Sequence, residues 1–218
     1  MKKRIFILIL MFFSAFFLIS CKNSKKFEDN FSEITKIYFQ GENRENNSIC
    51  SICVGKREEP YRVDGIHNPV CDFSLLSLYS CEFYGDSVYV DIFVNNEKTV
   101  FELFYNPISN VYINDLGFAL SEDDEIFIVF DGDAINLINK SDCFVVDYKE
   151  AIKISTELLS DKITALYKNN VFMGECYLKV LSNKTDDSIF WLFSLQTRAG
   201  ETFNIVISVD TGQVVAEN

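Results

Sequence analysis

Four side chains between positions 50 and 71 are the best candidates for chemistry: Cys50, Cys53, His67 and Cys71. Their spacing, C-x2-C-x13-H-x3-C, falls within the range of zinc-finger ligands, because thiolates and imidazole hold zinc in tetrahedral sites. Zinc fingers of this type belong mostly to reducing compartments, whereas the N-terminal residues of this chain indicate export to an oxidising one. We therefore expect no metal and keep zinc as an alternative.

The pair Cys50 and Cys53 also has the spacing of a thiol redox motif. Such a motif needs the start of a helix to lower the thiol pKa, but the surrounding residues favour a strand and no βαβ pattern is nearby. His67 is the only histidine, so a histidine-assisted cysteine nucleophile would have to pair it with Cys71. Because no helix is predicted there to fix their geometry, we expect a protein that is not an enzyme.

The segment Asp131-Gly132-Asp133, with Asn136, contains oxygen ligands of the kind that calcium prefers. An EF-hand needs ligands at spaced positions of a longer loop that ends in glutamate, and no such glutamate stands there. The segment therefore indicates a turn at the end of a strand. The sequence also contains no glycine-rich phosphate-binding loop, so we expect no cofactor.

Six cysteines follow Cys21, and an even number in an exported protein permits up to three disulfides. The sequence does not sort the pairings. Free cysteines are often buried as small apolar side chains, which is the alternative. We expect at least one disulfide among the six candidates, which are Cys50, Cys53, Cys71, Cys81, Cys143 and Cys176.

Residues 1–20 have the order of a secretory signal peptide. Lys2, Lys3 and Arg4 form a positive region, and an apolar run from Ile5 to Ile19 follows. In a helix this run reaches only about 22 Å, which is short of the ~30 Å hydrocarbon core that a spanning helix must cross. The pattern predicts a removable leader and not a membrane span.

The leader ends in Leu18-Ile19-Ser20-Cys21, which resembles the lipobox of bacterial lipoproteins. The resemblance implies that Cys21 is acylated and becomes the mature N-terminus. Each buried methylene contributes about 0.8 kcal/mol, so two or three acyl chains hold a protein firmly on a membrane. We expect an exported protein of the bacterial cell envelope, anchored to a membrane through Cys21 and followed by a polar tether over residues 21–33.

The charge of the chain restricts its partners. Lys2, Lys3 and Arg4 would leave with the leader, which changes the formal net charge from −12 to −15. Such a surface repels phosphate backbones and anionic headgroups, so we expect no nucleic-acid partner and no membrane contact other than the lipid. Neutral, cationic or apolar partners fit better.

Residues 34–142 are predicted to form a β-rich domain, because their apolar side chains alternate with polar ones. The clearest case is a hairpin in which Val88, Val90 and Ile92 share a buried face with Thr99, Phe101 and Leu103, across a turn at Asn95-Asn96. The expected strands of this part are 34–39, 73–84, 87–94, 98–105 and 125–130.

Residues 143–218 are predicted to contain one helix and three strands. Asp147 caps the helix with Glu150 three residues later, and apolar residues recur at helical spacing to about Tyr167. Strands follow over 171–181, 189–197 and 202–209, and Asp210-Thr211-Gly212 forms a tight turn. A helix that covers an antiparallel meander indicates the α+β fold class for the chain, with a β-rich N-terminal part.

The helix with Ala151, the strand with Trp191, and the ending Val209-Asp210-Thr211-Gly212 with Val214 resemble the C-terminal end of a PepSY-like domain. The resemblance covers about residues 147–218. PepSY domains occur in peptidase propeptides and envelope proteins, so the resemblance implies a non-catalytic binding or peptidase-inhibitory role. It carries no catalytic residue across.

These observations together predict an envelope lipoprotein that binds another protein or a peptide without catalysis. A partner that docks by strand addition would use an exposed sheet edge near the C-terminus. The alternative is a carrier in which the Phe-rich sheets enclose a lipid or another small apolar ligand, and that function requires a large apolar cavity.

Overall fold

The computed structural model describes residues 27, 29–45, 47–183 and 187–218. The predicted leader, most of the tether and Cys21 lie outside these residues. Strand β1 begins at Phe31, and Phe27 is buried against Phe31 and Phe172.

The described residues form two groups of strands with two α-helices between them in the sequence. The first group is β1 (Phe31–Asn43), β2 (Ser48–Glu58), β3 (Val70–Tyr79), β4 (Ser87–Val94), β5 (Glu97–Asn106), β6 (Val111–Asp115), β7 (Ile126–Phe130) and β8 (Asp133–Asn139). A 3-10 turn, η1 (Ser141–Cys143), leads to the helices α2 (Tyr148–Leu158) and α3 (Ser160–Ala165). The second group is β9 (Tyr167–Lys168), β10 (Val171–Phe172), β11 (Gly174–Ser182), β12 (Ile189–Thr197), β13 (Thr202–Ser208) and β14 (Val214–Glu217).

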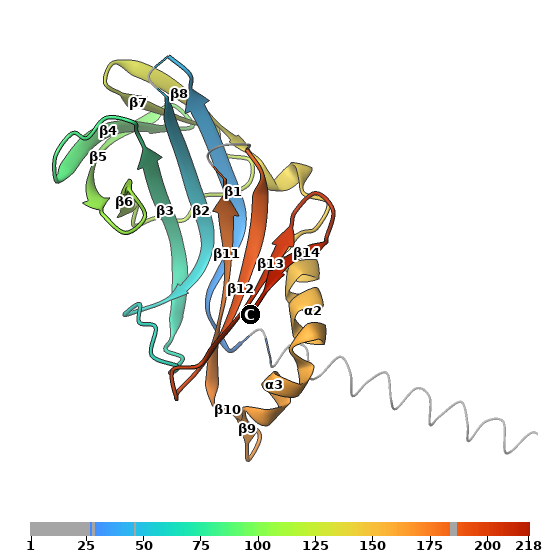
Figure 1. Cartoon of the computed structure of the whole chain (residues 1–218). Helices are drawn as coiled ribbons and strands as arrows, with labels where there is room; N and C mark the ends of the chain where they lie inside the picture. Colours follow the sequence, from blue (N-terminus) through green and yellow to red (C-terminus); the bar gives the residue numbers. More distant parts are fainter. Residues whose placement is uncertain (1–26, 28, 46, 184–186) are drawn as a thin grey trace, which may run out of the picture.

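Strands β1 to β8 close into an eight-stranded antiparallel barrel in the order β1-β2-β3-β6-β5-β4-β7-β8. The barrel closes where β8 returns to β1, with Phe39 opposite Asn139 and Gln40 opposite Ile138. Figure 1 shows this barrel as the blue, green and yellow part of the molecule. Its closing strands are about a hundred residues apart in the sequence, so the closure is a tertiary pairing and not a local hairpin.

A four-stranded sheet extends from the other end of β1. There β1 pairs in parallel with β11, with Phe31 opposite Cys176 and Ile34 opposite Leu178. Strands β12, β13 and β14 continue outward from β11 as an antiparallel meander. Helix α2 packs on the side of β12 that carries Trp191, so one face of this sheet is covered by the helices (Figure 1).

The predicted α+β fold class, a β-rich part followed by a PepSY-like helix on a meander, is wrong. The described chain is almost entirely β and is built around the closed barrel. Helix α2 does contact β12, but the meander continues the sheet of β1 because β11 pairs with β1. Alternation of side chains identifies strands but does not show which strands pair. The expected strands of the N-terminal part also omitted β2, β6 and β8.

The predicted β4–β5 hairpin is confirmed in register. Val88 lies opposite Leu103 and Ile92 opposite Thr99, so the apolar faces coincide. Asn95 and Asn96 have positive φ angles of 51° and 70°, as the two-residue hairpin turn requires. Local turn chemistry and side-chain alternation were therefore sufficient to predict this element.

The predicted helix cap is also confirmed. The Asp147 carboxylate accepts a hydrogen bond from the Glu150 N–H at 2.8 Å, which satisfies one free donor of the first turn of α2. The helix is shorter than expected, because it ends at Leu158 and a second short helix begins at Ser160.

Two separate hydrophobic cores hold the molecule together. Tyr112, Ile52, Leu76 and Leu103 fill the barrel together with other buried side chains. The second core lies between the C-terminal sheet and the helices around Trp191, whose Nε1 donates a hydrogen bond to the Val146 carbonyl at 2.8 Å. Trp191 is thus a core residue.

Among the described residues, no helix has the length and the apolar character that a membrane span needs.

Two leucines of β11 provide a matched test of the second core. Leu178 is 0% exposed and Leu181 is 41% exposed. We expect Leu178→Ala to lower the free energy of unfolding by about 2–5 kcal/mol, because it removes buried methyl groups and leaves a cavity. Leu181→Ala should cost less than about 1 kcal/mol. Urea titration followed by Trp191 fluorescence measures both, and equal losses would contradict this placement of β11.

Candidate functional site

The structure separates the two cysteines of the C-x2-C motif. Cys50 and Cys53 both lie on β2, where an odd spacing places their side chains on opposite faces. Three residues of extended chain span about 10 Å, which exceeds the ~7 Å limit for a disulfide. Burial raises the pKa of the Cys50 and Cys53 thiols to about 12, so both are protonated at neutral pH. This geometry does not support a redox pair.

The zinc alternative is not supported either, because its four ligands are not brought together. His67 lies in the β2–β3 loop, with its Nδ1 3.4 Å from the Ser32 hydroxyl. Cys71 is exposed on β3, and its thiol hydrogen-bonds the Arg57 carbonyl. No group of three or more His, Cys, Asp or Glu side chains in the described part of the chain could hold a metal ion.

All six disulfide candidates are free thiols in this structure. Cys50 is buried in the barrel core and Cys176 in the core beside the helices, so these two cannot reach each other. The remaining candidates Cys71, Cys81 and Cys143 are exposed, while Cys53 is half-buried. The expectation of a disulfide remains a prediction.

The Asp131-Gly132 segment forms the β7–β8 turn. Asp131 and Gly132 have positive φ angles of 54° and 87°, which are typical of a two-residue hairpin turn. The structure thus places this segment at a strand end, as its residues predict.

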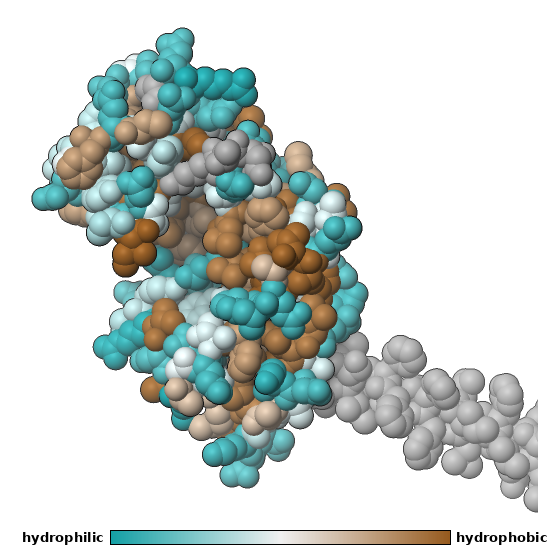
Figure 2. Space-filling model, viewed as in Figure 1, coloured by the Kyte–Doolittle hydropathy of each residue, from teal (hydrophilic) through white to brown (hydrophobic). Residues whose placement is uncertain are grey.

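The strongest candidate for a binding surface is the uncovered face of the C-terminal sheet. We call it the open apolar face and define it by Leu181, Phe190, Leu192, Val206 and Ala216. Leu192 lies opposite Val206, and Val206 lies opposite Ala216, so these side chains form a row across β12, β13 and β14. Figure 2 shows apolar side chains gathered over these strands. Phe190 is only partly buried on this face.

Strand β14 forms the edge of that sheet. Its only strand neighbour among the described residues is β13, and all four of its residues are exposed. Asn204 and Asn218 exchange both backbone hydrogen bonds, at 3.3 and 3.2 Å. Because hydrogen-bonded pairs alternate along antiparallel strands, the N–H and C=O of Glu217 point away from β13 toward the open edge. This edge can accept another strand.

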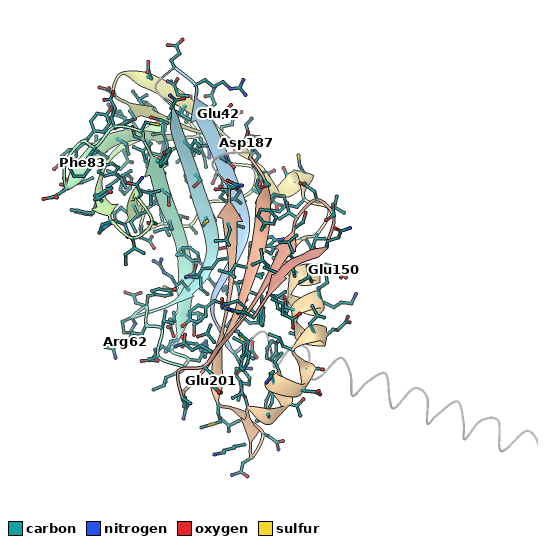
Figure 3. The ribbon with its side chains drawn as sticks, viewed as in Figure 1. Glu42, Arg62, Phe83, Glu150, Asp187 and Glu201 are labelled. Atoms are coloured by element: carbon teal, nitrogen blue, oxygen red, sulfur yellow. The ribbon has the colours of Figure 1, made fainter. Side chains whose placement is uncertain are left out.

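An open cleft of about 360 Å³ lies between β1, β8 and the start of β12. Its walls include Glu42, Arg44, Lys140 and Asp187, and Figure 3 shows Glu42 and Asp187 close to this junction. Arg44 already pairs with Glu42 at 2.6 Å. A cleft with polar walls and both signs of charge does not suit an apolar ligand.

No family model, no curated protein and no solved structure matches this chain.

The sequence contained a signal for the open apolar face that strand prediction alone did not use. Strands β12 and β13 are apolar at most consecutive positions, for example Trp191, Leu192 and Phe193. A strand with apolar side chains on both faces needs two apolar neighbours, and here the helices cover only one face. The other face therefore stays partly exposed and is a candidate binding surface.

The positions of the cysteines predict their reactivity. We expect iodoacetamide at neutral pH to modify Cys71, Cys81 and Cys143 in the folded protein, whereas Cys50 and Cys176 react only after unfolding, because they are buried and protonated. Mass spectrometry of the alkylated peptides measures this. Exposed cysteines that resist alkylation until a reductant is added would show a disulfide instead.

Proposed function

We propose that this chain is a lipid-anchored protein of the bacterial cell envelope that binds an extended segment of another protein, without catalysis, at the edge of β14. The observation that carries the proposal is the exposed edge strand beside an open apolar face. Strand addition combines backbone hydrogen bonds along an edge with side-chain contacts on one face, and both are available here.

The chemistry of the edge indicates what the partner segment should contain. A strand that pairs with β14 would hydrogen-bond the outward N–H and C=O of Glu217. Its alternate side chains would extend the row of Leu192, Val206 and Ala216, so they should be apolar. The chain carries a formal net charge of −12, which favours basic residues at the remaining positions of the partner.

The carrier alternative is less well supported. An internal ligand site needs space, but the barrel interior holds the fully buried side chains of Tyr112, Ile52, Leu76 and Ile128. Eight-stranded barrels are just wide enough for side chains to fill them. The described core therefore favours the protein-binding function over the enclosure of a small apolar molecule.

Proline at position 217 tests the strand-addition proposal. A photoreactive amino acid at Val215, which is 53% exposed, should crosslink the partner in intact envelopes. We expect Glu217→Pro to reduce this adduct roughly tenfold, because proline removes the outward N–H and its ring blocks the edge. Glu217→Gln should retain the adduct, since it keeps the backbone donor.

The matched control places the same photoreactive residue at Glu150, which is exposed on α2. No specific adduct is expected there. An adduct at position 215 that persists unchanged in Glu217→Pro would refute strand addition, and turnover of a substrate by the purified protein would refute the non-catalytic assignment.

The lipid anchor has its own test. Cys21→Ser should move the protein from the membrane fraction to the soluble fraction, because the thiol that would carry the acyl chains is lost. Fractionation followed by intact mass measurement records both effects. Native protein that is soluble, unmodified and still attached to its leader would contradict the anchor.

A further inference from the structure

The loop between β2 and β3 lies on the same face of the C-terminal sheet as the open apolar face. We call residues 59–69 the strap. Its Tyr61 hydroxyl accepts a hydrogen bond from Lys179 at 2.6 Å, and its Arg62 carbonyl accepts one from the Tyr177 hydroxyl at 3.1 Å. Lys179 lies opposite Leu192, so the strap borders the open apolar face. The strap thus covers the polar side chains Tyr177 and Lys179 on this side of the sheet. The apolar side chains on the same side remain exposed.

Two buried glutamates accept hydrogen bonds from backbone N–H groups of the strap. The Glu58 carboxylate accepts from Arg62 N–H at 3.1 Å and from Asn68 N–H at 3.0 Å. The Glu175 carboxyl group accepts from Gly65 N–H at 2.6 Å. These bonds are spread along the strap, so the two carboxyl groups hold it in place together with Tyr177, Lys179 and Arg198.

The two carboxyl groups are almost completely shielded from water. Glu58 is 2% exposed and Glu175 is 0% exposed, and the two carboxyl groups are close enough to affect each other's ionisation. Glu175 Oε1 is buried and meets no donor among the described residues. A proton on this oxygen that is donated to Glu58 would satisfy both groups, whereas two ionised carboxylates in contact would repel each other.

The close fit of Gly65 shows that the strap has one specific position. A Cβ at this residue would lie 2.9 Å from the Arg198 backbone, and its φ of 75° is in the left-handed region that favours glycine. The Arg198 guanidinium also donates to the Gly65 carbonyl at 3.4 Å. The strap is therefore a fitted cover and not a loose loop.

Other charged and titratable groups surround the pair on every packed element. Glu33 of β1 pairs with Lys179 of β11 at 3.3 Å, so these two charges are already compensated. The charged and titratable groups of the strap and around the pair are Glu33 on β1, Arg57 on β2, Glu59, Tyr61, Arg62, Asp64 and His67 on the strap, Tyr177 and Lys179 on β11, and Arg198 after β12.

We propose that the strap is a proton-controlled cover, which lies on the sheet while Glu58 and Glu175 hold one proton between them and lifts when both are ionised. When the strap lifts, Tyr177 and Gln196 become exposed. The open apolar face is then continuous with these polar side chains. This inference concerns the strap alone, and it holds whether or not a partner binds at β14.

The directions of the two pKa shifts support a single shared proton. Burial raises the pKa of Glu175, so the stability that its protonated form contributes is lost as the pH rises through that pKa. Burial opposes ionisation of Glu58 as well, but the N–H groups of Arg62 and Asn68 outweigh it and lower the pKa of Glu58. Its contribution is lost as the pH falls. The strap should be closed between the two pKa values and open on either side.

Amide hydrogen exchange of the full chain tests the cover. We expect the protection factors of the Arg62, Gly65 and Asn68 amides to pass through a maximum between the pKa values of Glu58 and Glu175 and to fall at least tenfold as the pH rises above that of Glu175. Glu175→Gln should abolish the alkaline fall, because glutamine stays neutral, donates to Glu58 and still accepts from Gly65.

The matched control is Glu201→Gln, which neutralises an exposed carboxylate in the neighbouring β12–β13 turn (Figure 3). It should retain the wild-type profile. Strap protection that does not change with pH in the wild type, or an alkaline fall that persists in Glu175→Gln, would overturn the proposal. If Glu175→Gln fails to fold, the wild-type exchange profile and an NMR titration of the carboxyl carbons of Glu58 and Glu175 test the proposal instead. An ordinary glutamate pKa for both groups would overturn the proposal.

Discussion

The whole structure depends on strand β1 serving two sheets at once. Its C-terminal part closes the barrel against β8, and its N-terminal part pairs with β11, while β2 pairs along most of its length. A register shift between Thr35 and Ile37 marks the bend between the two parts. At Gly41 an added Cβ would lie 2.1 Å from the Asn136 carbonyl oxygen, so only glycine permits the close approach that closes the barrel.

This double pairing explains why the C-terminal sheet has one open face. The helices cover only the side that carries Trp191. The barrel strands follow β1 at the edge of the C-terminal sheet, so they do not cover its other side. The other side is divided between the apolar row across β12 to β14 and the strap held by Glu58 and Glu175. One face thus combines the open edge of β14 with a loop that two buried glutamates hold in place.

Local elements of this fold could be predicted from the sequence, but their assembly could not. The β4–β5 hairpin and the Asp147 cap depend on residues a few positions apart, and both are confirmed. The fold class was wrong because barrel closure and the parallel β1–β11 pair join strands separated by about a hundred residues or more, and alternation is the same whichever strand is the partner.

The candidate site shows the same division. The sequence by itself determined the leader pattern that ends at Cys21, the turn residues, and strands β12 and β13 with apolar side chains on both faces. Only the tertiary structure decided that β14 is an edge, that Cys50 and Cys53 face opposite ways, and that Glu58 meets Glu175. The reason is physical: side-chain periodicity is fixed by neighbouring residues, whereas burial and charge contact arise only when distant segments exclude water together.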